Sequence, residues 1–343
     1  MPLAPALATG LEPSKGNNMQ AWFCHDPTGV DALQWQEVPT PEPEAGQVLV
    51  AVHAASLNFP DLLIVQNKYQ FKPPLPFVPG SEFAGVVQAV GEGVQRFKPG
   101  DRVLAMGGTG GFGSHAVVAQ DKLQPLPEGM SFEQGAAFVL TYGTTLHALL
   151  DRGRLKSGET VLVLGAAGGV GTAAVQIAKA AGARVIAAAS TDEKCAMVKQ
   201  LGADETINYS TANLRDALKA ATGGKGPDLV YDPVGGDLAE PVFRSIAWRG
   251  RYLVVGFAGG GIPALPWNLA LLKGASIVGV FWGDFVRREP AAFAKDMAQL
   301  STWFSEGKVS PLVQKTLKLS DLHQAYALMA NRQVIGKMVL VPG

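Results

Sequence analysis

Cysteine is scarce in this sequence. The 343 residues include only two, Cys24 and Cys195, and they lie far apart along the chain. So few thiols exclude a disulfide scaffold and any zinc site with four cysteine ligands. Unpaired cysteines are typical of a reducing compartment, so we expect a cytoplasmic protein.

The chain also lacks an excess of charge of either sign. Lys and Arg together number 29, as do Asp and Glu, so the overall charge gives no support to a nucleic-acid partner. No apolar run reaches the roughly 18 residues that a membrane-spanning helix needs, and no membrane partner is expected. Residues 1–18 lack the basic start and apolar stretch of a signal peptide, and we expect a flexible extension there.

The pattern of strands and helices changes near Ser131. Before it, short strand-like runs alternate with Gly and Pro, which is typical of a mostly β domain. After it, strand-like runs alternate with helical ones, which predicts a parallel sheet covered on both faces. The chain exceeds the usual size of one core, so two domains are expected. The segment after Trp282 is too short for a third domain and is expected to return to the first.

The most informative motif is VLVLGAAGGVG at residues 161–171. An apolar strand ends in glycines, and the apolar residues that follow recur on one face of a helix: Val170, Ala174, Ile177, Ala178 and Ala181. Such a helix N-terminus attracts a pyrophosphate, and the next strand-like run, ARVIAAAS, completes a βαβ unit that binds dinucleotides. We expect a Cβ on Gly168 or Gly169 to strike the pyrophosphate or to force the backbone out of its turn, since glycine alone tolerates such close approach and positive φ. The alternative is a structural turn with no ligand.

The residues about twenty positions further on bear on which dinucleotide binds. From Ala187 to Ser190 there is no carboxylate for a ribose 2′-hydroxyl, and Lys194 follows within one helical turn. A 2′-phosphate would meet a hydroxyl and a cation there, so the pattern favours NADPH. Asp192 and Glu193 leave NAD open, because either carboxylate can fold back toward the ribose.

The run SIVGVFW, residues 276–282, reads as the last strand of the parallel sheet. It is apolar and rich in β-branched residues, and an unpaired edge of this kind favours pairing with a second copy in a homodimer. The alternative is a strand covered by the returning tail.

Several motifs in order resemble one known family: VHAASLNFPDLL, PFVPGSEFAGVV, FKPGDRV, YDPVGGD and GKMVLV, together with the glycine turn. They resemble the zinc-independent quinone oxidoreductases of the medium-chain dehydrogenase/reductase superfamily. The resemblance implies an α/β fold with NADPH in the cleft between two domains. The first is a discontinuous, mostly β, GroES-like catalytic domain of residues 19–140 and 285–343. The second is a Rossmann domain with a doubly wound parallel sheet, residues 141–284.

Zinc members of that superfamily carry a cysteine shortly before an Asp and a histidine just before a Glu. This chain has Asn58 before Asp61, and Ser81 before Glu82. Neutral amide and hydroxyl groups are poor zinc ligands, so we expect hydride transfer without a metal.

The resemblance also implies site residues. Asn58 corresponds to an asparagine near the nicotinamide ribose, and Tyr69 to a tyrosine that orients a substrate carbonyl, with a merely packed aromatic as the alternative. Both are candidate catalytic residues. The candidate cofactor-binding residues are Asn58 and Thr144 near the nicotinamide, Ala167, Gly168, Gly169, Val170 and Gly171 at the pyrophosphate, Ser190, Lys194, Tyr209 and Arg332 at the 2′-phosphate, and Gly256, Phe257, Phe281 and Trp282 at the last strand ends.

Three functions remain open at this stage. The first is reduction of a quinone, and the second is reduction of an enone or an enoyl thioester such as acryloyl- or crotonyl-CoA. Both place negative charge on an oxygen, and since no His or Lys stands out as a general acid, solvent can protonate the enolate. The third function is cofactor binding with little turnover.

Overall fold

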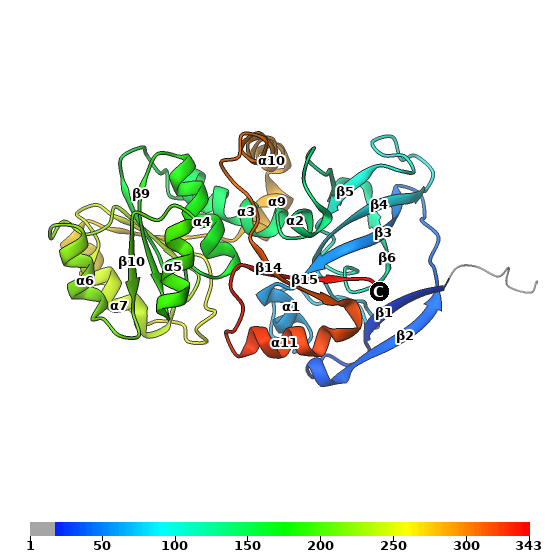
Figure 1. The fold of residues 1–343 in the computed structure, drawn as a ribbon, viewed down its shortest axis with the longest axis horizontal. Helices are drawn as coiled ribbons and strands as arrows, with labels where there is room; N and C mark the ends of the chain where they lie inside the picture. Colours follow the sequence, from blue (N-terminus) through cyan, green and yellow to red (C-terminus); the bar gives the residue numbers. More distant parts are fainter. Residues whose placement is uncertain (1–17) are drawn as a thin grey trace, which may run out of the picture.

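The computed structural model describes residues 18–343 (Figure 1). The flexible extension expected over residues 1–18 lies outside the described residues except for Asn18, which opens the first strand. Two bodies lie side by side, one built on an antiparallel-rich sheet and the other on a parallel sheet, with α3 and α10 between them (Figure 1). This arrangement confirms the expected α/β fold.

The first body contains a seven-stranded sheet with spatial order β14-β15-β3-β4-β5-β7, and β6 pairs with β3 beside this path. Its strands are β3 (Gln47–Ser56), β4 (Glu82–Val90), β5 (Arg102–Ala105), β6 (His115–Ala119), β7 (Leu123–Pro125), β14 (Val313–Lys318) and β15 (Lys337–Val341). A separate antiparallel pair is formed by β1 (Asn18–Cys24) and β2 (Leu33–Pro39). Val48, Val50 and Val52 of β3 are all buried, which is the alternation expected of a strand with one face on a core.

The second body contains a six-stranded parallel sheet with order β10-β9-β8-β11-β12-β13. Its strands are β8 (Thr160–Val163), β9 (Arg184–Ala189), β10 (Glu205–Asn208), β11 (Leu229–Asp232), β12 (Arg251–Val254) and β13 (Ser276–Gly279). In chain order this is 3-2-1-4-5-6, the order of a doubly wound Rossmann sheet, in which ligands bind at the carboxyl ends of the strands where the order reverses. That point lies between β8 and β11.

Helices cover both sheets and join them. They are α1 (Phe59–Ile64), α2 (Phe132–Ala136), α3 (Val139–Leu146), α4 (Gly169–Ala180), α5 (Asp192–Gln200), α6 (Leu214–Ala221), α7 (Ala239–Ser245), α8 (Asn268–Lys273), α9 (Trp282–Arg288), α10 (Pro290–Ser305) and α11 (Leu322–Ala330). A π-helical segment, His147–Arg152, continues α3, and short 3-10 turns lie at Val30–Ala32, Gln120–Lys122, Gly236–Leu238 and Leu319–Asp321. Within residues 18–343, no helix is both long and apolar enough to cross a membrane.

Helix α4 differs from the one-sided helix that its apolar spacing predicts. Residues 171–178 are buried on every side, including Thr172 and Gln176. The cause is tertiary: one face packs on the parallel sheet and the other on α3, while the Gln176 amide donates to the Ser310 carbonyl at 3.0 Å. A helix enclosed on both faces shows no polar stripe.

The tail after β13 crosses back to the first body, where β15 pairs antiparallel with β3 through Val339 opposite Ser56 and Leu340 opposite Ala55. Strand β13 is therefore left as the open edge of its sheet, and three of its four residues are exposed. Trp267 is 87% exposed, and other large apolar side chains of this region, Trp248, Leu271, Leu272 and Ile277, are exposed as well. The domain bounds 19–140, 141–284 and 285–343 stay a prediction.

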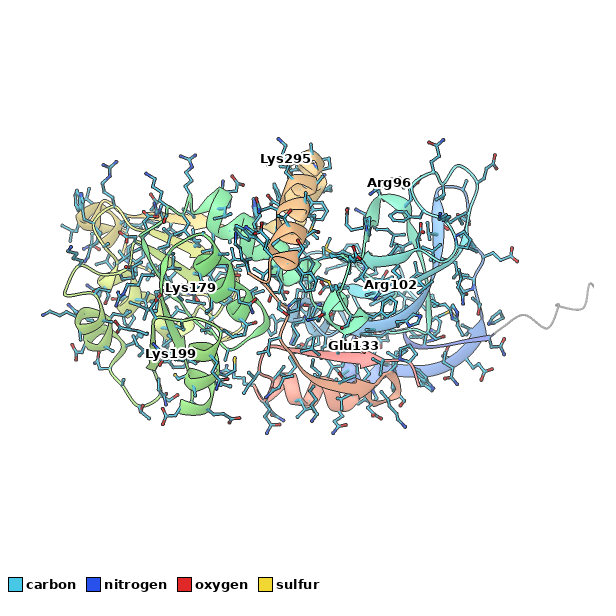
Figure 2. All side chains as sticks on the ribbon, turned by 45° about the horizontal axis from the view of Figure 1, so that its top comes forward. Arg96, Arg102, Glu133, Lys179, Lys199 and Lys295 are labelled. Atoms are coloured by element: carbon cyan, nitrogen blue, oxygen red, sulfur yellow. The ribbon has the colours of Figure 1, made fainter. Side chains whose placement is uncertain are left out.

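Figure 2 shows the side chains over the whole fold, with six charged ones labelled. The labelled lysines come from separate helices, with Lys179 on α4, Lys199 on α5 and Lys295 on α10. Lys179 is bound to Asp204 at 2.9 Å. Lys179 and Lys199 thus lie on the parallel-sheet body, and Lys295 lies on the helix between the two bodies.

Candidate active site

The glycine turn connects β8 to α4 at the point where the strand order reverses. Gly165 has φ of 56°, the left-handed conformation that glycine tolerates best. A Cβ on Gly171 would collide with the Gly165 carbonyl oxygen and would lie 2.7 Å from the Ala166 Cα. The first N–H groups of α4, at Gly169, Val170 and Gly171, point out of the helix end without partners inside it and can bind an anion.

The prediction about positive φ at Gly168 and Gly169 is wrong. Gly168 is the N-cap residue with φ of −79°, and Gly169 begins the helix, so the left-handed turn is made earlier, at Gly165. A Cβ on Gly168 would meet only the Gly165 oxygen, at 3.4 Å, which is ordinary contact. A Cβ on Gly169 would lie 2.6 Å from Cδ of Lys337. The protein itself therefore fills the space on one side of Gly169.

The turn is joined to the other body through its backbone. Gly336 donates its N–H to the Ala167 carbonyl oxygen at 2.7 Å, and Gly168 forms a parallel bridge with Gly336. The cofactor turn and β15, which are far apart in sequence, thus form one continuous structure.

A group of buried polar side chains lies directly beyond this junction. Asn58 caps α1, and it is 3% exposed. Its Nδ2 donates to Glu82 Oε2 at 3.3 Å, while its Oδ1 accepts from Lys337 Nζ. Lys337 also donates to the Leu57 carbonyl at 3.0 Å. The amide of Asn58, a candidate catalytic residue, is thus held from both sides by charged groups of the protein.

The two carboxylates of this group are fully satisfied. Glu82 accepts from the Leu140 N–H at 2.8 Å and from Ser56 Oγ at 3.0 Å. Asp61 accepts from the backbone N–H groups of Asn58 at 2.8 Å and Ser81 at 3.0 Å. Hydrogen bonds of this number are what buried charges require.

Burial dominates the protonation of the group. It raises the pKa of Asp61 to about 6, against the opposing effect of the two N–H donors, and it raises the pKa of Glu82. Burial also lowers the pKa of Lys337, whereas the Glu82 and Asp61 carboxylates act to raise it. Burial thus disfavours the charged form of all three groups, while the attraction between the cation and the two acids favours it.

The residues predicted to bind a 2′-phosphate come together at the end of β9. Lys194 Nζ donates to Ser190 Oγ at 3.3 Å and to the Arg332 carbonyl at 3.0 Å. The Arg332 guanidinium reaches toward the Gly259 carbonyl at 3.5 Å, and Tyr209 is attached to the Ala189 carbonyl through its N–H at 3.0 Å.

Asp192 and Glu193, the two carboxylates that left NAD as an alternative cofactor, differ in their surroundings. Asp192 Oδ1 accepts from Asn208 Nδ2 at 2.7 Å, and Glu193 is exposed on α5. Thr191 caps the helix, because its Oγ1 accepts the Lys194 N–H at 3.2 Å. A phosphate between Ser190 and Lys194 would therefore lie near an Asp192 carboxylate that Asn208 already binds.

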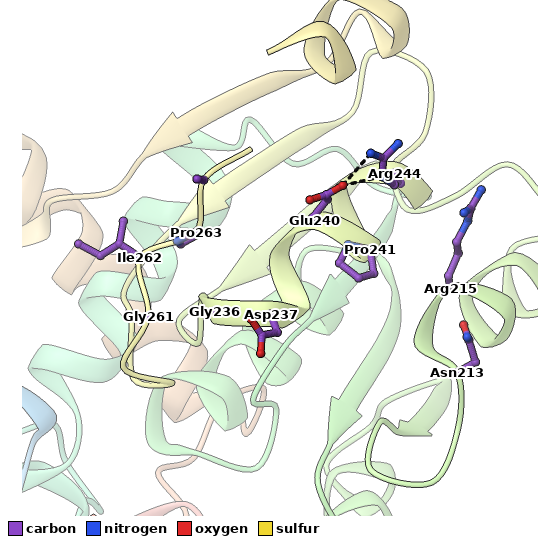
Figure 3. A pocket seen from close by; sticks show the side chains of 11 residues that line it. Asn213, Arg215, Gly236, Asp237, Glu240, Pro241, Arg244, Gly261, Ile262 and Pro263 are labelled. Atoms are coloured by element: carbon purple, nitrogen blue, oxygen red, sulfur yellow. Dashed lines mark hydrogen bonds and ion pairs between the residues drawn. The ribbon is translucent and has the colours of Figure 1, made fainter. Parts of the chain in front are cut away.

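A pocket of about 570 Å³ lies among the loops that follow β10, β11 and β12 (Figure 3). It is lined by polar side chains, including Asn213, Arg215 and Asp237, while Arg244 is paired with Glu240 at 2.6 Å. Its lining includes no residue of the turn between β8 and α4, so this pocket is distinct from the predicted pyrophosphate site.

The two aromatic residues after β13, Phe281 and Trp282, differ in their burial. Phe281 is 55% exposed, whereas Trp282 is 6% exposed and packs against Gly143 of α3. Within residues 18–343, the Trp282 Nε1 is buried without a hydrogen-bond partner. A buried donor of this kind costs free energy unless a ligand supplies an acceptor.

The other candidate residues come from both bodies. Gly256 and Phe257 follow the end of β12, with the Gly256 N–H directed to the Asp232 carbonyl at 3.3 Å. Thr144 is half-buried on α3. Tyr69 packs against the core of the first body, and burial, followed by the Asp61 charge, raises the pKa of its phenol. Among residues 18–343, no three His, Cys, Asp or Glu side chains gather as a metal site.

Three members of the buried group were not identified as site residues from the sequence: Asp61, Glu82 and Lys337. Each stands in a quoted motif, and the available signal was a charged residue beside apolar strand residues, as in GKMVLV. A lysine at a strand end is usually solvated, so its burial depends on packing between the two bodies.

Comparison with known proteins agrees with this geometry. Residues 44–128 match the family model of the alcohol dehydrogenase GroES-like domain, and residues 169–302 match that of the zinc-binding dehydrogenases. Quinone oxidoreductase-like protein 2 of Rattus norvegicus is 40% identical over 90% of this chain and 88% of its own length.

Solved structures are similar over nearly the whole chain. The Escherichia coli quinone oxidoreductase complexed with NADPH has a TM-score of 0.86 at 31% identity, covering 94% of this chain and 100% of that protein. A probable oxidoreductase from Mycobacterium abscessus has a TM-score of 0.86 at 39% identity, with 95% and 99% covered.

Proposed function

Because the chain belongs to the quinone oxidoreductase family of the medium-chain dehydrogenase/reductase superfamily, we propose that it transfers a hydride from NADPH to a quinone without a metal ion. The observation that carries the proposal is the group at the end of β9, where Lys194 Nζ donates to Ser190 Oγ and to the backbone carbonyl of Arg332. This group offers a hydroxyl and cations to a 2′-phosphate, while the Asp192 carboxylate is bound by Asn208.

The residues present fit NADPH. The first N–H groups of α4 suit a pyrophosphate, and the open space beside Gly168 leaves room for it. Trp282 Nε1 on α9 is a buried donor in need of an acceptor, which a carboxamide or a substrate oxygen can provide.

When bound, NADPH supplies the hydride; the protein has to hold its carbon about 3 to 3.5 Å from the electrophilic carbon and exclude water. Lys194 and Arg332 neutralise the 2′-phosphate. Asn58 is fixed at the junction of the two bodies by Glu82 and Lys337. The phenol of Tyr69, whose pKa is raised by burial, can donate a hydrogen bond to the oxygen on which charge develops.

The metal-free part of the proposal rests on Asn58 and Ser81. The Asn58 Oδ1 is occupied by the Lys337 ammonium, and Ser81 offers only a neutral hydroxyl. An amide already bound to a cation is a poor zinc ligand.

A homodimer and a cytoplasmic location complete the proposal. The open edge of β13 and the exposed Trp267, Leu271 and Ile277 make an apolar surface of the kind that pairs with a second copy. Both cysteines are free and buried, in keeping with a reducing compartment.

Initial rates with NADPH test the function on three substrates: a naphthoquinone, a simple enone and a crotonyl thioester. We expect the quinone to have the highest kcat/KM, before and after dialysis against a strong chelator. A higher kcat/KM for the thioester or the enone would contradict a quinone as the substrate. Activity that is lost on chelation and restored by zinc would contradict the metal-free mechanism. Tight NADPH binding with no turnover would instead indicate a cofactor-binding protein.

A further inference from the structure

Lys337 lies between the cofactor turn and the Asn58 amide, and it is 6% exposed. Its stem passes beside Gly169, where a Cβ would lie 2.6 Å from Cδ and 3.4 Å from Cγ of the lysine. The backbone next to it is fixed as well, because the Lys337 N–H donates to the Leu312 carbonyl at 2.8 Å. The lysine therefore has no free space in which to change its path.

The far end of the same side chain determines how the Asn58 amide is oriented. Lys337 Nζ donates to Asn58 Oδ1, and Glu82 Oε2 accepts from Asn58 Nδ2 at 3.3 Å. An amide turned by 180° would place its NH₂ against the ammonium and its oxygen against the carboxylate, and both contacts would be repulsive. The pair of charges thus permits one orientation of the amide.

We propose that Lys337 is a positioning residue that links the phosphate turn to Asn58. The position of the turn at Gly169, where the pyrophosphate would bind, then determines the position of the Asn58 amide. This inference rests on the proposed function, since it assumes that a dinucleotide occupies the turn. It differs from simple charge compensation of Glu82 and Asp61, for which any nearby cation would serve.

The test compares Lys337→Met with wild type. Methionine keeps an apolar stem beside Gly169 but has no Nζ, so the NADPH dissociation constant should stay within about threefold of wild type. The rate of hydride transfer in a single turnover should fall about tenfold or more, because Asn58 is no longer held. Lys273→Met is the matched control: Lys273 also donates to a carbonyl, that of Ile246 at 3.2 Å, on another part of the parallel-sheet body.

A second variant guards against unfolding. Removing one cation leaves two buried carboxylates, so Lys337→Met is expected to be less stable. In the double variant Lys337→Met with Glu82→Gln, one negative charge is removed too. We expect its melting temperature to recover while hydride transfer stays slow. Recovery of both would overturn the proposal, since charge compensation would then be the only role of Lys337.

A readout independent of turnover is the side-chain amide resonance of Asn58, assigned by its loss in Asn58→Asp. In wild type it should shift when NADPH binds, and in Lys337→Met it should shift much less. An equal shift in both proteins would overturn the link. Failure of the proposed function has a different signature, namely no NADPH binding or no quinone turnover in wild type itself.

Discussion

Gly336 and Ala167 are joined by a backbone hydrogen bond of 2.7 Å, which makes the strand carrying Lys337 part of the wall of the cofactor turn. The proposed nucleotide site is therefore built by both bodies. A substitution at the turn can act directly on ligand binding or indirectly through Lys337. Substitutions at different positions of the turn distinguish these two effects.

Gly168→Ala tests the turn without disturbing Lys337. The added Cβ has only the Gly165 oxygen nearby, at 3.4 Å, so the protein should fold normally. If the pyrophosphate passes over this residue, NADPH affinity should fall about tenfold, or about 1.4 kcal/mol, in a fluorescence titration. Gly283→Ala, in open space on α9, is the control. Unchanged affinity would make the glycine cluster a structural turn.

Lys194→Ala should weaken NADPH but not NADH. Lys194 lies with Ser190 and Arg332 at the proposed 2′-phosphate site, and a charge-assisted hydrogen bond at a half-exposed position is worth about 1.5 kcal/mol. The dissociation constant for NADH divided by that for NADPH should thus drop by about tenfold. Lys199→Ala, on the same helix but bound to the Asp204 carbonyl, should leave the ratio as it is. A preference that survives in Lys194→Ala would place the selectivity elsewhere.

Ile277→Asp should give a monomer. Ile277 is exposed on β13, and in a two-fold pairing of that edge the new carboxylates would face each other. Sedimentation should show the variant near 35.9 kDa and the wild type at twice that mass. Leu75→Asp changes an exposed leucine on the other body and should not alter the assembly. A monomeric wild type at micromolar concentration would contradict the proposed dimer.

Asp296→Asn should make stability less dependent on pH. Burial, aided by the Asp151 charge, raises the pKa of Asp296 from 3.8 to about 6. The native state thus binds this proton more tightly than the unfolded chain, and the stability it contributes is present below pH 4 and lost as pH rises through 6.

The melting temperature of wild type should therefore fall more between pH 5 and 7.5 than that of Asp296→Asn. Asp284→Asn is the matched control: Arg287 and Arg288 lower the pKa of Asp284, so it stays ionised throughout this range and its removal leaves the slope unchanged. Parallel curves for Asp296→Asn and wild type would contradict the raised pKa.

Local patterns account for what the sequence predicted well. The apolar run before Gly165 and the helical pattern after it predicted the βαβ unit. The absence of a carboxylate up to Ser190 directed attention to this strand end, where Lys194 contacts Ser190 in the structure. The turn chemistry was misassigned because glycines at N-cap and first-turn positions look the same in sequence as one with positive φ.

Long-range packing explains what was missed. Lys337 and Asn58 are separated by 279 positions, and neither residue's neighbours in sequence indicate the contact. Only the pairing of β15 with β3 brings the lysine inside. The burial of α4 on both faces has the same origin, since it depends on α3 and the segment around Ser310.

The wall that Gly336 adds to the turn has a consequence for synthesis on the ribosome. All six strands of the parallel sheet have been made once residue 279 is joined, but Gly336 and Lys337 follow only after α9, α10, β14 and α11. A nascent chain therefore completes its nucleotide-binding sheet long before it completes the nucleotide seat. We therefore expect full affinity for the dinucleotide only after the two bodies have docked.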